Sequence, residues 1–99
     1  MFYQKIFSIF KTEKFKHLLK FYKVKSIAIF GSYAKGEPSA GSDVDFLVEF
    51  EKGADLWDQV GLKNDLEKLI KKSVDVATPR GLSRYIRDKV LREAVYLHV

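Results

Sequence analysis

Two short apolar segments, separated by a glycine-rich stretch, constrain this chain more than any other feature. Residues 26–30 (SIAIF) form an apolar run that ends at Gly31, and residues 43–50 (DVDFLVEF) alternate between apolar and polar side chains. The first pattern is typical of a buried strand and the second of a strand with one buried face. Residues 31–42 between them carry three of the six glycines and one proline, so they form a turn or loop.

The rest of the chain predicts three helices and one more strand. Apolar residues at helical spacing predict a helix over residues 2–22, whose lysines lie mostly on the outer side, and a last helix over residues 82–97. A further helix is expected from an N-cap at Asp55 to about Lys71. Residues 73–77 (SVDVA) predict a third strand, followed by a turn.

The same spacing predicts which residues of the later helices face the core. For the helix after Asp55 they are Leu56, Trp57, Val60, Leu66, Leu69 and Ile70. For the last helix they are Leu82, Ile86, Val90, Leu91, Ala94 and Val95. The element order predicts an α/β (α+β) fold in which a small mixed three-stranded sheet packs against helices. At 99 residues, we expect residues 1–99 to form a single domain.

Composition excludes several classes of function. The chain has no cysteine, which rules out disulfide frameworks, thiol catalysis and cysteine-based zinc sites. Its net charge is +5, but the lysines near the N-terminus lack the glycine and arginine clustering of nucleic-acid binders, so we do not expect direct nucleic-acid binding. Lysines interrupt the apolar N-terminal residues, so we expect no export signal, no membrane span and a cytoplasmic location.

Acidic residues concentrate around the second predicted strand. Asp43 and Asp45 are two positions apart, so both carboxylates lie on the same face of a strand. Asp75 lies at the centre of the third predicted strand and joins them if the two strands are neighbours. Carboxylates this close repel each other unless a cation lies between them, and hard divalent metals prefer oxygen ligands. The pattern therefore predicts a metal site on one face of the sheet.

The turn before these acids predicts a phosphate site. Gly31 and Ser32 follow a buried strand, where backbone N–H groups and a hydroxyl can bind phosphate oxygens, and Gly31 allows a close approach. Lys35, in the same loop, is a candidate for phosphate contact. Carboxylates, metals and a phosphate cradle together indicate phosphoryl or nucleotidyl transfer. An EF-hand loop starting at Asp43 is excluded, because it would need glycine where Val48 stands.

The segment FGSYAKGEPSAGSDVDFLVEF resembles the signature of the DNA polymerase beta nucleotidyltransferase superfamily, Gly-Ser followed after ten residues by Asp-x-Asp. With a chain this short, it looks like the minimal nucleotidyltransferases (MNT domains) that act as MntA-type antitoxins. The resemblance implies the nucleotidyltransferase fold, two Mg²⁺ ions, ATP as donor, and transfer of AMP to a hydroxyl, expected to be a tyrosine, of a partner HEPN-domain toxin.

Residue by residue, the resemblance assigns Gly31 and Ser32 to phosphate binding, Asp43 and Asp45 to the metals, and Asp75 to the third catalytic acid. Lys35 stands where the family pattern usually has arginine, which removes a bidentate contact. Two alternatives stay open at this point. The chain could neutralise a toxin by contact alone, without catalysis, or it could modify a small hydroxylated molecule.

Overall fold

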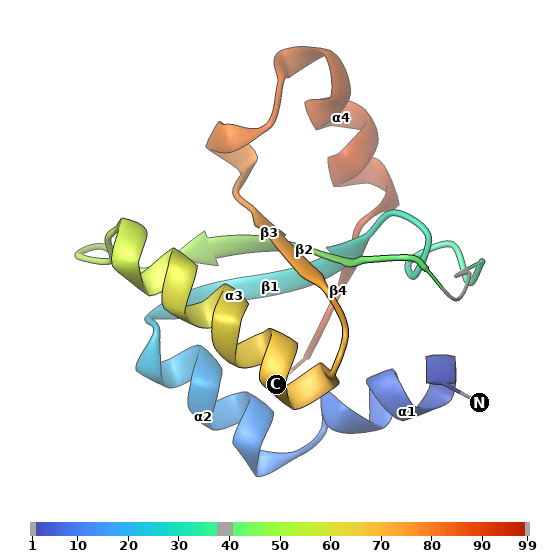
Figure 1. Cartoon of the computed structure of the whole chain (residues 1–99). Helices are drawn as coiled ribbons and strands as arrows, with labels where there is room; N and C mark the ends of the chain where they lie inside the picture. The colour runs from blue at the N-terminus through green and yellow to red at the C-terminus, as the bar shows by residue number, and fades with distance from the viewer. Residues whose placement is uncertain (1, 38–40, 99) are drawn as a thin grey trace.

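The computed structural model describes residues 2–37 and 41–98, which fold into helices on both sides of a mixed sheet. In chain order the elements are α1 (Phe2–Ile9), α2 (Glu13–Phe21), β1 (Val24–Phe30), β2 (Val44–Phe50), α3 (Leu56–Ile70), β3 (Val74–Ala77), the 3-10 helix η1 (Pro79–Gly81), α4 (Arg84–Glu93) and β4 (Val95–Tyr96). Helices α1, α2 and α3 lie on one side of the sheet, and α4 lies on the other (Figure 1). The predicted fold class is confirmed.

The sheet has the strand order β3-β2-β1-β4. Strand β1 pairs antiparallel with both β2 and β4, whereas β2 and β3 are parallel. The sheet is therefore mixed, as predicted, and the three predicted strands correspond to β1, β2 and β3. None of the described helices is both long and apolar enough to span a membrane.

One face of the sheet packs against the helical layer of α1, α2 and α3. The core contains alternate residues of the strands together with apolar residues of these helices: Ile6, Phe10, Phe15, Leu19, Ile27, Ile29, Tyr33, Val44, Phe46, Val48, Leu62, Leu66, Ile70, Val74 and Val76. The alternation predicted for β2 is confirmed on this side. The same alternation puts Leu47 on the face that carries Asp45 and predicts that it is exposed, but Leu47 is buried there, opposite Ala28 in the register.

The prediction of one continuous helix over residues 2–22 is wrong, because this segment forms two helices, α1 and α2. Thr12 separates them and serves both: its hydroxyl donates to the Ile9 carbonyl oxygen at 2.7 Å and accepts from the Phe15 N–H at 3.3 Å. The side chain thus adds a second hydrogen bond to the Ile9 carbonyl, which also accepts the Thr12 N–H, and caps the start of α2. The break lets the Phe10 ring contact both Phe15 and Phe46.

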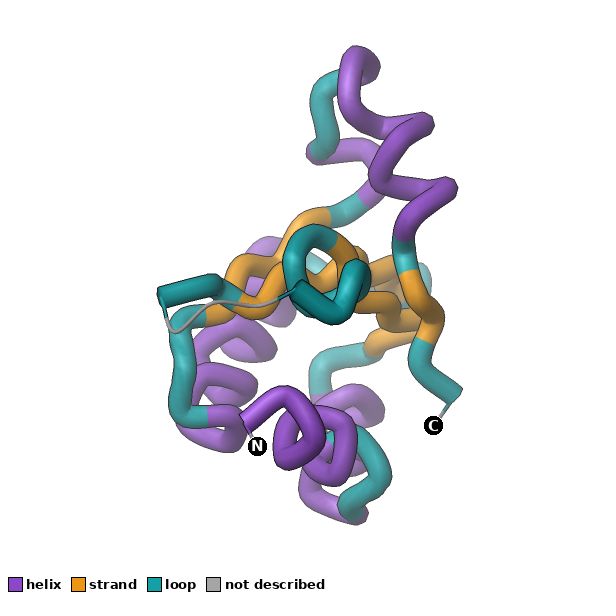
Figure 2. Tube along the Cα trace, turned by 90° about the vertical axis from the view of Figure 1, so that its right-hand side faces the viewer, coloured by secondary structure: helices purple, strands orange, loops and turns teal. Residues whose placement is uncertain are grey.

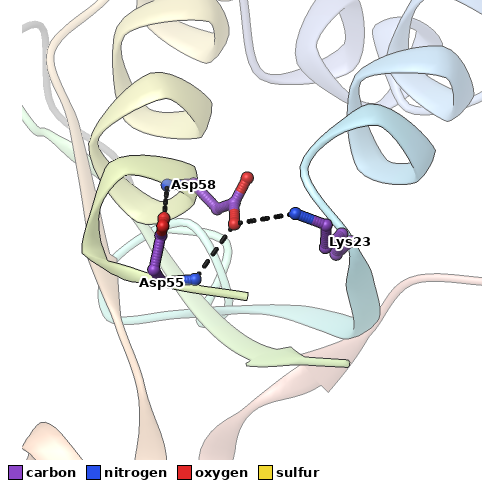
Figure 3. A network of polar contacts seen from close by, with 3 residues as sticks. All are labelled: Lys23, Asp55 and Asp58. Atoms are coloured by element: carbon purple, nitrogen blue, oxygen red, sulfur yellow. Dashed lines mark hydrogen bonds and ion pairs between the residues drawn. The ribbon is translucent and has the colours of Figure 1, made fainter. Parts of the chain in front are cut away.

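Helix α3 begins at the predicted N-cap. The Asp55 carboxylate accepts from the Asp58 N–H, and the Asp58 carboxylate accepts from the Asp55 N–H, which together form a capping box. Lys23, in a left-handed conformation (φ 61°) after α2, places its ammonium 3.3 Å from Asp58 (Figure 3). The hydrogen bond from the Asp55 backbone, followed by the contacts with Lys23, lowers the pKa of Asp58. This network fixes the start of α3 against the turn between α2 and β1.

The predicted inward face of α3 is correct only for its second half. Leu66 and Ile70 are buried and Leu69 is partly buried, but Leu56, Trp57 and Val60 are exposed, Trp57 to 79%. These three side chains belong to the first five residues of α3, whereas the residues of α3 that reach the core begin at Leu62.

The last helix differs most from its prediction. It ends at Glu93, because Ala94 turns to an extended conformation, and Val95–Tyr96 then forms β4 along the edge of β1. Leu97 continues this pairing by donating its N–H to the Ile27 carbonyl at 2.9 Å. The sheet thus gains a fourth strand that periodicity did not predict. None of the residues expected to be buried on this helix is buried, namely Leu82, Ile86, Val90, Leu91, Ala94 and Val95.

Gly61 lies inside α3 for a steric reason. A Cβ atom added there would lie 2.5 Å from Cε1 of Tyr22, whose ring fills the space between α2 and α3. The Tyr22 hydroxyl donates to the Asp65 carboxylate one turn later, which holds the ring in place. The glycine therefore allows the two helices to pack closely around a fixed aromatic ring.

We predict that Gly61→Ala destabilises the protein by about 1–3 kcal/mol through overpacking, although alanine is the better helix former. In a Tyr22→Ala background the same substitution should instead stabilise, by up to about 1 kcal/mol. Urea unfolding of the four proteins measures both effects. The same sign in both backgrounds would contradict the steric explanation.

Candidate active site

The pairing of β2 with β3 brings the predicted acids together. In this parallel register Asp45 lies opposite Asp75. Both side chains point away from the helical layer, because their neighbours Val44, Phe46, Val74 and Val76 are buried in the core on that side. Asp43 precedes β2 and is exposed, two positions before Asp45. The condition set by the sequence, that the second and third strands be neighbours, is met.

Asp45 is the most perturbed carboxyl group of this face. Its burial, then the charge of Asp75, then that of Asp43, raise the pKa of Asp45 to about 6. Burial is the largest of these causes, so the surroundings of Asp45 disfavour its ionised form even without the charges of Asp75 and Asp43. A cation close to the three acids would reverse this effect, because an opposite charge favours the ionised carboxylate.

Gly31 lies directly against Asp45. Its φ of +73° falls in the left-handed region that favours glycine. A Cβ atom added to Gly31 would lie 2.5 Å from Oδ2 of Asp45. The backbone of the predicted phosphate loop therefore touches the carboxylate of the predicted metal site, which brings the two halves of the motif into one place.

The loop after β1 is a compact turn held by its own backbone. The Lys35 N–H donates to the Gly31 carbonyl at 3.2 Å, and the Glu37 N–H donates to the Ser32 carbonyl at 3.0 Å. Tyr33 anchors the turn, since its side chain is buried in the core beneath it. Ser32 is half-buried and follows Gly31 directly. Ser32 is therefore the residue next to the one that contacts Asp45.

Lys35 has a neighbour that the sequence did not indicate. Its ammonium lies 3.8 Å from the Glu93 carboxylate at the end of α4. Its predicted contact with a phosphate stays a prediction, because the ion pair shows only that the loop and α4 meet here. A second cation was also missed: the Lys72 ammonium lies 5.7 Å from the centroid of the Tyr33 ring. Nothing in the spacing links Lys35 with Glu93 or Tyr33 with Lys72, since both pairs form only through the fold.

Comparison with known proteins agrees with this geometry. Residues 12–97 match the family model of the nucleotidyltransferase domain. The chain belongs to this family.

One relative in sequence and two solved structures illustrate what this nucleotidyltransferase is similar to. The protein adenylyltransferase MntA of Thermococcus cleftensis is 39% identical over 94 residues, which are 95% of this chain and 94% of that protein. A solved structure of a candidate minimal nucleotidyltransferase is 41% identical, with a TM-score of 0.74 over 84% of this chain and 85% of that one. A crystal structure of a toxin–antitoxin with AMP-PNP is 26% identical, with a TM-score of 0.71 over 86% of this chain and 70% of that one.

The acids of this nucleotidyltransferase suit a hard divalent cation. They offer only carboxylate oxygens, and the raised pKa of Asp45 is what uncompensated repulsion and burial produce. Within residues 2–37 and 41–98, however, no three histidine, cysteine or acidic side chains are already arranged to hold a metal ion. The sheet register pairs Asp45 with Asp75, whereas Asp43 precedes β2 and is not fixed by strand pairing.

We predict that Gly31→Ala lowers nucleotidyl transfer about 100-fold, because the new Cβ displaces the Asp45 carboxylate. The left-handed backbone adds about 1–2 kcal/mol of destabilisation. Gly53→Ala is the matched control: it also has a positive φ, of +97°, but its Cβ would meet nothing within 4 Å. It should lose stability and keep its activity. Equal loss of activity in both variants would contradict the contact.

The raised pKa of Asp45 predicts how stability depends on pH. Unfolded Asp ionises near pH 3.9, so ionisation of Asp45 opposes folding, and the free energy of unfolding falls as pH rises from about 4 through about 6. Asp45→Asn should remove this effect. In urea unfolding with a chelator, the variant should exceed the parent by on the order of 1 kcal/mol at pH 8, after allowance for solvent screening, and by nothing near pH 3. Parallel pH profiles of the two proteins would disprove the assignment.

Proposed function

We propose that this chain transfers AMP from ATP to a hydroxyl of a partner HEPN-domain toxin and thereby acts as an antitoxin. The observation that carries the proposal is the contact between the Gly31 backbone and Asp45, which brings the turn predicted to bind phosphate beside two paired acids. The names of the relatives support it: one is a protein adenylyltransferase, MntA, and another is a toxin–antitoxin crystallised with AMP-PNP. AMP-PNP is an ATP analogue, which agrees with ATP as the donor.

Two Mg²⁺ ions would be held by Asp43, Asp45 and Asp75. When bound, they would neutralise charge on the triphosphate and help to align the attacking and leaving oxygens. Asp45 is then kept in its ionised form, although the protein alone favours its protonation.

The loop residues bind the donor. The Gly31–Ser32 turn would receive the β- and γ-phosphates through backbone N–H groups and the Ser32 hydroxyl. Lys35 would add a positive charge once its exposed ion pair with Glu93 opens, and a pair of this kind is weak in water. These contacts would hold the α-phosphate on the face of the sheet that carries Asp45 and Asp75.

Asp75 would take part in the transfer itself. The acceptor hydroxyl gives its proton to the Asp75 carboxylate, which is exposed and therefore within reach of a group on another protein. The acceptor oxygen forms a bond to the α-phosphorus, the bond to the β-phosphate oxygen breaks, and pyrophosphate leaves. A tyrosine is the proposed acceptor, and its modification would add negative charge near the toxin's RNA-binding site.

We predict that incubation with Mg²⁺, ATP and the HEPN protein encoded beside this chain adds one or more AMP units to that protein, measured as intact mass. Asp43→Ala should abolish the gain. Ser32→Ala should slow it by about 1–3 kcal/mol in transition-state terms, because the backbone N–H groups remain. Glu49→Ala, an acidic residue of β2 that is exposed like Asp43, is the matched control and should keep full activity.

The same experiment separates the alternatives. Neutralisation of the toxin without a mass change, or by the Asp43→Ala variant, would identify an antitoxin that acts by contact alone. Modification of a small hydroxylated molecule, with no modification of the HEPN protein, would identify a transferase of the other class.

A further inference from the structure

Helix α4 lies apart from the other helices and has little to pack against. It stands on the opposite side of the sheet from the layer of α1, α2 and α3 (Figures 1 and 2). None of its residues is buried. A ten-residue helix is marginal in water unless an apolar face is covered, so α4 lacks the packing that stabilises most surface helices.

The exposed apolar side chains of the molecule gather on and after this helix. Among the described residues, five of the nine large exposed hydrophobic side chains fall between positions 85 and 96. They are Tyr85, Ile86, Leu91, Val95 and Tyr96, with exposures of 83%, 48%, 39%, 42% and 43%. Single exposed apolar residues are ordinary, but five within twelve positions give this segment the apolar side chains that an interaction surface needs.

This region is attached to the candidate active site at both ends. Its N-terminal end follows β3, which carries Asp75, through η1. Its C-terminal end contacts the loop after Gly31 through the pair of Glu93 and Lys35, 3.8 Å apart. A protein held on α4 would therefore lie next to the acids and the phosphate loop.

The charges of this region favour an acidic partner. Residues 80–96 contain five basic residues and two acidic residues, Asp88 and Glu93, and Glu93 is already paired with Lys35. None of the five has a carboxylate within 4 Å in the part of the chain that the structure describes. The basic residues are Arg80, Arg84, Arg87, Lys89 and Arg92. An occupant with carboxylates around an apolar centre would complement both the charge and the exposed hydrophobic side chains.

Other occupants match the surface less well. A second copy on a two-fold axis would bring this positively charged surface against an identical one, which is repulsive. Nucleic acid would pair with the arginines but offer little to Ile86, Leu91 and Val95, because its interfaces are polar.

We propose that residues 80–96 form the docking surface for the acceptor protein, whose contacting surface is apolar at its centre and acidic at its rim. This rests on the proposed function, in that the acceptor is a protein. It adds where that protein binds and what chemistry its surface has.

The test measures binding separately from transfer. The dissociation constant of the HEPN protein is measured by calorimetry without ATP, for the parent, Tyr85→Ala, Leu91→Ser and the double charge reversal Arg84→Glu/Lys89→Glu. Each variant should weaken binding about tenfold or more, as loss of an interface anchor does. The shift in melting temperature caused by Mg²⁺ and ATP should stay that of the parent. Phe21→Ala, equally apolar and 71% exposed on α2, is the matched control and should bind like the parent.

Because ATP is absent, failure of AMP transfer and failure of docking are distinguishable. Weakened binding in the α4 variants supports the proposal even if the parent transfers no AMP. Unchanged binding in all three variants, or no binding by the parent, would overturn it. So would a homodimer that Leu91→Ser dissociates, or RNA binding that only the charge reversal removes.

Discussion

The parallel pairing of β2 with β3 is the constraint on which the rest of the molecule depends. It sets Asp45 opposite Asp75 on one face of the sheet, where burial and mutual repulsion disfavour ionisation of Asp45. Parallel neighbours require a crossover connection, and α3 supplies it. The same helix packs Leu62, Leu66 and Ile70 against the other face, so the connection that creates the acidic pair also contributes the apolar packing that offsets its cost.

The two faces of β2 consequently have different tasks. Val44, Phe46 and Val48 contribute to the core, while Asp45, between them in sequence, lies on the face to which we assign the chemistry. Leu47 is an exception, because it is buried on that same face, opposite Ala28 of β1 in the register. The face that carries the acids therefore also contains a buried apolar residue.

Much of this arrangement could be predicted from the sequence, because β2 and β3 show their periodicity locally and Asp55 is a typical N-cap. The failures have different causes. The break at Thr12 is local, because its hydroxyl bonds with Ile9 and Phe15, whereas β4 forms because the extended residues after Ala94 pair with β1. The exposure of Trp57 depends on what packs beside the start of α3. Helical periodicity alone indicates none of these. The pairing of Lys35 with Glu93 is similarly absent from any local pattern, because it joins a loop to a helix more than fifty residues away.

The close contact of Gly31 with Asp45 has a consequence for how such domains are compared. The two positions do not vary independently, because any side chain at the first takes the space of the carboxylate at the second. A related chain could keep every acidic residue of the motif and still have lost its site through one methyl group in the turn. The glycine is therefore as informative as the aspartates about whether a relative has kept a working centre. A substitution at Gly31 would also displace the Asp45 carboxylate without changing the net charge of the protein.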